Sequence, residues 1–258
     1  MKFKVFIFSV FCLLITNSTM QAQDAEYTDL LVMYVDEDYE KCLKKAEKYM
    51  DKDESKNDAL PYLYTAMTYF EMSRDSKFSE DFPNAYKNSI SYLTKYRKKD
   101  KAYAYKSDSQ QFIEKVKLVL AEEIDNYILD DNEKSDKKIT NLLKKIVRID
   151  PEDGGSEFML GVYYYKTKNK SEGKKYLASG KKRVLEIGDS IAFGDMTQTQ
   201  QLFFKESIVA FYKLNVDRFP ADAKEILLLG KEYFTEERED CYIENKADYL
   251  KVYKDIEG

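Results

Sequence analysis

The sequence is similar to itself at a spacing of 69 residues, and this internal repeat limits the fold more than any other feature. Six positions match in character without a gap. The matched pairs are Ile139 with Ile208, Leu143 with Tyr212, Pro151 with Pro220, Leu160 with Leu229, Gly161 with Gly230, and Tyr164 with Tyr233. Repeats at a fixed spacing are typical of proteins in which successive units stack and bury a shared core. We therefore expect stacked units in this part of the chain.

Apolar residues recur at helical spacing from Asp36 to Ile256. No segment of five or more residues between turn signals alternates convincingly between apolar and polar residues. Only 9 Gly and 4 Pro are present, which is few for a fold rich in turns. We predict an all-α fold with loops at 74–81 and 188–197. The expected helices cover 36–50, 57–70, 83–96, 109–127, 135–146, 156–168, 171–187, 198–215, 221–234 and 240–256.

Small and large residues alternate in a recognisable order within the repeat. The motif Leu160-Gly161-x-x-Tyr164 resembles the first-helix signature of tetratricopeptide repeats, and Gly173, Leu177 and Gly180 follow at the spacing of the second helix. The repeat spacing is also close to twice the length of one such unit, about 34 residues. This resemblance implies stacked antiparallel helix hairpins, a TPR-like α-solenoid with irregular repeats, over residues 24–258.

The chain departs from the family pattern in several places. Glu157 stands where an aromatic residue is usual, 74–81 is an insertion, the helix at 109–128 is too long, and 188–197 breaks the register. The resemblance is therefore good for 135–187 and 208–250 and weak elsewhere. The alternative is a generic helical bundle in which the L-G-x-x-Y motifs occur by chance.

Residues 1–23 have the three parts of a secretory signal peptide. Lys2 and Lys4 precede an apolar stretch from Val5 to Ile15, and a polar segment follows. Eleven residues are too few to cross a bilayer comfortably, although retention as an anchor stays open. We expect cleavage near Ala22 or Gln23 and a periplasmic or secreted protein. Lipidation of Cys12 is an alternative, which the preceding Phe11 disfavours.

Two cysteines remain after removal of the leader, Cys42 and Cys241. An oxidising compartment would permit a bond between them. Cys42 lies in an apolar helical stripe beside Leu43 and Ala46, which favours a buried thiol. A bond between the two would indicate a closed shape rather than an open superhelix.

Composition argues against several classes of function. The chain has no His, which removes the usual near-neutral base and the His-dependent nucleophile and zinc systems. The net charge is −5, with both signs interspersed, which argues against a nucleic-acid partner. The acidic clusters at 36–38, 130–133 and 236–240 lack the ligand spacing of an EF-hand, and no glycine loop could cradle phosphate. We therefore expect no catalytic, cofactor-binding or metal-binding residues.

The leading hypothesis is a binding scaffold for a peptide or protein partner in the cell envelope. The resemblance implies a concave face on the first helices of successive units. The candidate contact residues are Thr65, Tyr69, Phe158, Val162, Tyr165 and Lys166. One alternative is a structural subunit of an envelope assembly, bound through terminal helices such as the one carrying Tyr242, Tyr249, Leu250 and Tyr253. A remoter alternative is a carboxylate-dependent enzyme acting on glycans, on a helical scaffold.

Overall fold

The computed structural model describes residues 27–130, 132–187, 192–234, 239, 241 and 247–257. The expected signal peptide at 1–23 lies outside these residues. Within the described ranges the chain is helical and contains no strand, so the all-α prediction is confirmed. None of the described helices is both long enough and apolar enough to cross a membrane. The chain divides into two compact units between Lys99 and Asp100, whereas the sequence suggested one continuous repeat domain.

The first unit contains the helices α1 (Thr28–Val35), α2 (Tyr39–Asp51), α3 (Leu60–Arg74) and α4 (Ala85–Lys99). A single 3₁₀ turn, η1 (Ser76–Phe78), lies in the predicted loop between α3 and α4. Helix α3 packs against both α2 and α4, which explains why its buried residues lie on more than one face. Helix α1 closes the unit, because its Leu30 is fully buried with Cys42 and Ala46 of α2.

Cys42 is a buried free thiol. Its Sγ receives a hydrogen bond from the Thr68 hydroxyl at 3.4 Å and donates one to the Leu30 carbonyl at 3.7 Å. Burial raises the pKa of this thiol above its ordinary value. The expectation of a buried thiol is therefore confirmed, and Cys42 is not bonded to Cys241.

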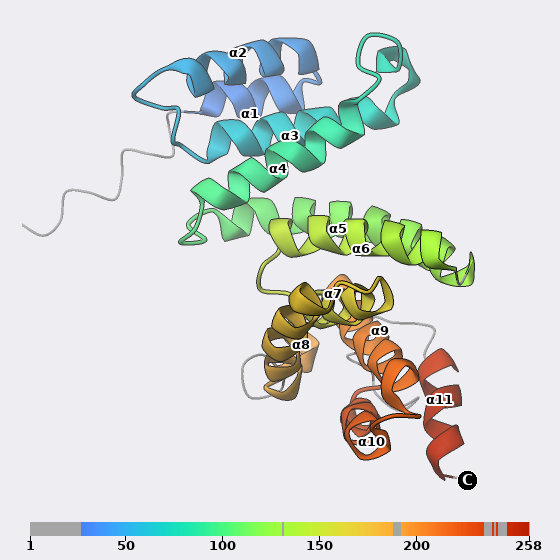
Figure 1. Cartoon of the computed structure of the whole chain (residues 1–258). Helices are drawn as coiled ribbons and strands as arrows, with labels where there is room; N and C mark the ends of the chain where they lie inside the picture. The colour runs from blue at the N-terminus through green and yellow to red at the C-terminus, as the bar shows by residue number, and fades with distance from the viewer. Residues whose placement is uncertain are drawn as a thin grey trace, which may run out of the picture. The chain divides into compact units, whose positions relative to one another are not determined.

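The second unit contains α5 (Lys106–Asp130), α6 (Glu133–Ile149), α7 (Gly154–Lys166), α8 (Lys170–Leu185), α9 (Gln198–Asn215), α10 (Pro220–Leu228) and α11 (Ala247–Glu257). Two 3₁₀ turns, η2 (Phe193–Asp195) and η3 (Leu229–Glu232), complete it. Consecutive helices pack on each other from α5 to α8, as do α9 and α10 (Figure 1). Helix α7 also packs along α9, which follows α8 in the chain.

Most helix boundaries agree with the sequence patterns, and three places differ. Helix α1 was not predicted, since its six successive apolar residues, Leu30 to Val35, show no helical stripe. Helix α5 begins at Lys106, so the expected cap Ser109 lies inside its first turn. The expected helix at 221–234 ends at Leu228, and the second L-G-x-x-Y motif lies in and just after η3. The two copies of the motif therefore differ in local structure.

Gly161 of the first motif and Gly180 of the following helix lie where α7 and α8 contact each other. A Cβ added to Gly161 would lie 2.5 Å from the backbone nitrogen of Leu177. A Cβ added to Gly180 would lie 2.4 Å from the Cα of Phe158. Because backbone atoms cannot move aside like a flexible side chain, only glycine permits this separation of the two helices. The spacing of small residues in the sequence is thus explained by packing.

We predict that Gly161→Ala destabilises the protein. In an exposed helix this change would stabilise by up to about 1 kcal/mol, because alanine favours the helix. Here the new methyl group would overlap Leu177, so we expect the free energy of unfolding to fall by about 1–3 kcal/mol. Urea unfolding followed by circular dichroism measures the change. Ser179→Ala on the exposed face of α8 is the control and should alter stability by less than about 0.5 kcal/mol. An increase in stability on Gly161→Ala would contradict the packing.

Candidate functional site

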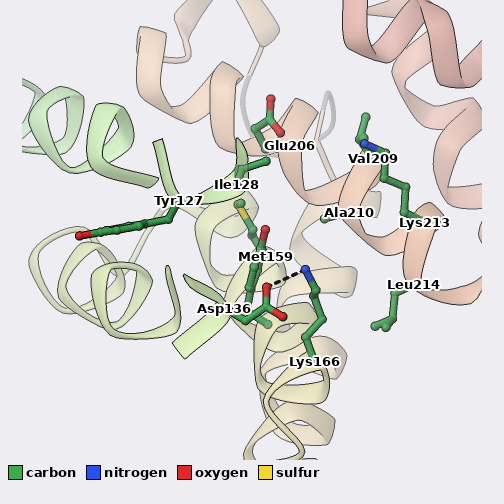
Figure 2. Close-up of a pocket in the computed structure, with 11 residues that line it drawn as sticks. Tyr127, Ile128, Asp136, Met159, Lys166, Glu206, Val209, Ala210, Lys213 and Leu214 are labelled. Carbon is green, nitrogen blue, oxygen red and sulfur yellow. Dashed lines mark ion pairs between the residues drawn. The ribbon is translucent and has the colours of Figure 1, made fainter. Parts of the chain in front are cut away.

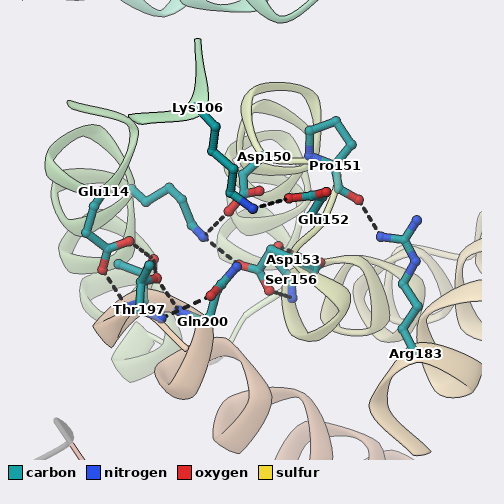
Figure 3. A network of polar contacts seen from close by, with 12 residues as sticks. Lys106, Glu114, Asp150, Pro151, Glu152, Asp153, Ser156, Arg183, Thr197 and Gln200 are labelled. Atoms are coloured by element: carbon teal, nitrogen blue, oxygen red, sulfur yellow. Dashed lines mark hydrogen bonds and ion pairs between the residues drawn. The ribbon is translucent and has the colours of Figure 1, made fainter. Parts of the chain in front are cut away.

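A buried ammonium group joins three helices of the second unit. The Lys117 side chain of α5 is fully buried, and its Nζ lies 2.6 Å from Asp150 and 2.8 Å from Asp153 (Figure 3). Asp150 ends α6, and Asp153 caps α7 by accepting a hydrogen bond from the Ser156 backbone at 3.0 Å. One charge on α5 therefore holds the turn between α6 and α7.

The buried ammonium group of Lys117 and the buried carboxylate of Asp153 stabilise each other. Burial by itself lowers the pKa of Lys117, but the two carboxylates outweigh it and raise the pKa above its ordinary value. Burial raises the pKa of Asp153, and the charge of Lys117 opposes that rise. Lys117 and Asp153 therefore depend on each other to remain charged inside the protein.

A second contact from the same face of α5 holds the start of α9. Glu114 lies one turn before Lys117, and it accepts hydrogen bonds from the Thr199 backbone and the Thr199 hydroxyl, both at 2.7 Å (Figure 3). Thr197 and Gln200 form a capping box at the same helix start. Helix α5 thus fixes the N-terminal ends of both α7 and α9.

The start of α7 lies close to the second turn of α9. A Cβ added to Gly155 of α7 would lie 2.5 Å from the backbone nitrogen of Phe204 in α9. This glycine brings the two backbones together at that level. The two helices form a pocket further along their length.

The pocket has a volume of about 410 Å³ and lies among four helices of the second unit (Figure 2). Its lining comes from Tyr127 and Ile128 of α5, Asp136 of α6, Met159, Tyr163 and Lys166 of α7, and five residues of α9 between Glu206 and Leu214. Volumes of a few hundred Å³ are common for ligand sites. Helices α5, α7 and α9 are each the first of two consecutive helices that pack together.

The pocket combines apolar walls with charges of both signs. Lys166 pairs with Asp136 at 2.6 Å and also lies over the Tyr163 ring, 4.8 Å from its centroid (Figure 2). Glu206 pairs with the buried Lys205 at 2.9 Å. Lys213 is exposed and forms no ion pair within the described part of the chain. The pocket therefore offers one ammonium group whose charge is not already neutralised.

Only one of the sequence-predicted contact residues of α7 lines this pocket, namely Lys166. Phe158 and Val162 are fully buried in the core of the unit. Tyr165 faces α8, since a Cβ added to Gly173 would meet its ring at 2.6 Å. The pocket face of α7 carries Met159 and Tyr163, which follow Phe158 and Val162 by one position.

The other two candidates lie in the first unit. Thr65 is buried, and its hydroxyl donates a hydrogen bond to the Pro61 carbonyl at 2.7 Å. Tyr69 is half-buried, and its ring stacks on Tyr92 with centroids 5.8 Å apart. Tyr69 therefore reaches the surface, and Thr65 does not.

Sequence reasoning missed the contribution of α9 to the pocket. The repeat aligns Ile139 of α6 with Ile208 of α9, so α9 was not recognised as a helix that lines the pocket. The sequence feature that could have indicated this contribution is Lys213. This charged residue lies one turn after Val209, which is buried. Within the described residues, no group of three or more Cys, Asp or Glu side chains is arranged to hold a metal ion.

Lys117→Met should lower the free energy of unfolding by about 3–5 kcal/mol, since it leaves Asp153 buried without its cation. The pKa of Asp153, already raised by burial, should rise further. The folded protein would then bind a proton more tightly than the unfolded chain. Its stability should fall as the pH rises from about 4 through the folded pKa of Asp153. Urea unfolding at mildly acidic and neutral pH measures both effects.

The matched control is Lys115→Met, which removes an exposed lysine from the same helix. This variant should change stability by less than about 0.5 kcal/mol and should retain the pH dependence of the parent protein. Equal losses in the two variants would show that Lys117 has no special role in holding the helices.

Comparisons with known proteins identify no relative of this chain. No protein-family model, no curated protein and no solved structure matches it. The function must therefore be argued from the geometry and chemistry of the described residues.

Proposed function

We propose that this chain is a TPR-like binding scaffold of the periplasm or the cell exterior, and that it holds a segment of a partner protein in the pocket among α5, α6, α7 and α9. This proposal rests on which helices line the pocket. They come mainly from the first helices of three successive helix pairs, which is where the resemblance to tetratricopeptide repeats places a ligand.

The chemistry of the pocket supports a segment with an apolar side chain next to an acidic one. Met159, Val209 and Leu214 offer apolar contacts. Lys213 is the charged group that a ligand carboxylate could neutralise without first breaking an ion pair. A charge-assisted hydrogen bond of this kind is roughly twice as strong as a neutral one.

A structural subunit of an envelope assembly is the second candidate, and the first helix favours it. Leu31, Val32 and Val35 of α1 are 44%, 51% and 66% exposed and form an apolar patch on one side of the helix. The C-terminal helix lends no such support, because Tyr249 and Tyr253 are buried in the core of the second unit. Leu250 is partly buried against the same core, and Tyr242 lies outside the described residues.

The pocket can be tested by blocking it in the whole protein. Ala210→Arg places a long side chain in the pocket, and Lys213→Glu reverses the free charge. We expect both variants to lose, by about tenfold or more, a partner that the parent protein captures by crosslinking from the envelope fraction. Mass spectrometry of the captured material measures the loss and locates the crosslinked residues.

Two control variants carry the same changes on α8, away from the pocket. Ala178→Arg and Lys174→Glu alter exposed positions and should capture the partner as well as the parent does. A partner that survives both pocket variants, or that crosslinks only to α1, would overturn the pocket and favour the structural subunit.

The proposal also places the protein outside the cytoplasm after removal of its leader. We expect the N-terminus of the secreted or periplasmic protein to be Gln23 or Asp24, because Ala22 and Gln23 are the candidate last residues of the leader. Intact-mass measurement of the protein from its native host identifies the N-terminus. A chain that still begins at Met1 in a membrane fraction would mean that the leader is retained as an anchor.

A further inference from the structure

Six aromatic rings form an unbroken series in the first unit, which we call the aromatic stripe. The ring centroids of successive members lie 5.8–6.4 Å apart. In order of contact they are Tyr39, Phe78, Phe82, Tyr69, Tyr92 and Tyr62. They come from α2, the segment around η1, α3 and α4, so the fold gathers them from separate parts of the chain.

The stripe lies at the surface of the unit. All six side chains are half-buried, whereas neighbouring core residues such as Leu63 and Leu93 are almost fully covered. The hydroxyl groups of Tyr69 and Tyr92 have no hydrogen-bond partner within the part of the chain that the structure describes. The stripe thus presents ring edges, ring faces and free hydroxyl groups to a ligand.

Three rings of the stripe already form cation–π contacts with lysines of the same chain. Lys95 lies 4.2 Å from the centroid of Tyr92, Lys99 lies 4.8 Å from Tyr62, and Lys77 lies 4.8 Å from Phe78. These contacts are attractive because the face of an aromatic ring is electron-rich. Tyr69, in the middle of the stripe, has no such cation among the described residues.

Two acidic side chains lie beside this part of the stripe. Glu47 and Asp51 are exposed, lie one turn apart on α2, and form no ion pair within the described ranges. Burial raises the pKa of Tyr92, and the negative charges of Glu47 and Asp51 raise it further. Glu47 also acts in the same direction on the pKa of Tyr69. Among the described residues, Tyr69 therefore has no cation over its ring, and Glu47, the carboxylate that acts on it, forms no ion pair.

We propose that the aromatic stripe binds a basic segment of a partner protein, with an arginine side chain against Tyr69 and its charge neutralised by Glu47. Arginine fits this position better than lysine, because its planar guanidinium group stacks on aromatic rings and donates to carboxylates at the same time. This inference is independent of the pocket in the second unit, whose free charge is positive.

The test uses the whole protein and a fluorescein-labelled Gly/Ser peptide that carries several arginines. Fluorescence anisotropy gives its affinity, and the same peptide with citrulline or lysine in place of arginine separates guanidinium recognition from simple charge attraction. We expect the arginine peptide to bind at least about fivefold more tightly than either analogue. Equal binding of the lysine peptide would overturn the assignment to arginine.

The variants locate the binding. Tyr69→Leu and Glu47→Gln should each weaken the arginine peptide by about fivefold to tenfold, and Tyr69→Phe should retain most of the affinity because it keeps the ring. The matched controls in the second unit are Tyr176→Leu, a half-buried tyrosine stacked on Tyr164, and Glu122→Gln, an exposed acid on α5. These controls should leave the affinity unchanged.

Two further outcomes would overturn the proposal. The first is arginine-peptide binding that is unaffected by Tyr69→Leu and Glu47→Gln while circular dichroism shows both variants folded. The second is a cello-oligosaccharide that binds more tightly than any peptide and loses affinity on Tyr69→Leu, which would make the stripe a sugar platform. The pocket variants Ala210→Arg and Lys213→Glu should not affect the peptide, so failure here is distinguishable from failure of the pocket.

Discussion

The buried ammonium group of Lys117 is the interaction on which the second unit depends. An isolated buried charge would cost several kcal/mol, and here Asp150 and Asp153 offset that cost at 2.6 and 2.8 Å. The geometry required for this offset fixes α5 against the turn that joins α6 to α7. Glu114, one turn earlier, fixes the start of α9 in the same way. The positions of α7 and α9, and therefore the pocket between them, follow from two charged side chains on one face of α5.

The helices could be predicted from the sequence where local signals agree with packing. Helix α9 spans the predicted range because Thr197 and Gln200 cap its start, and the close approach of α7 to α8 follows from the spacing of Gly161 and Gly180. Helix α1 could not be predicted, since an apolar segment without periodicity shows no face. The second motif copy lies in and just after a 3₁₀ turn, where Gly230 packs against Tyr249 of α11 and Ile208 of α9, so its local structure did not follow from the motif.

The pocket face of α7 could not be predicted for a different reason. Successive residues of a helix point about 100° apart, so an error of one position selects a different neighbour. The sequence assigned Phe158 and Val162 to the ligand, but Gly180 and the core of the unit occupy that side. Met159 and Tyr163 face the pocket because Asp153 and Gly155 set the rotation of α7 against α5 and α9. Those contacts join residues distant in sequence, and a repeat pattern contains no record of them.

The pocket and the aromatic stripe differ in the charge that they can accept, and this difference bears on how a scaffold selects its partner. Within the described residues, Lys213 in the pocket and Glu47 and Asp51 beside the stripe form no ion pair. A segment suited to one site therefore meets a like charge at the other, so neither site competes for the other's ligand.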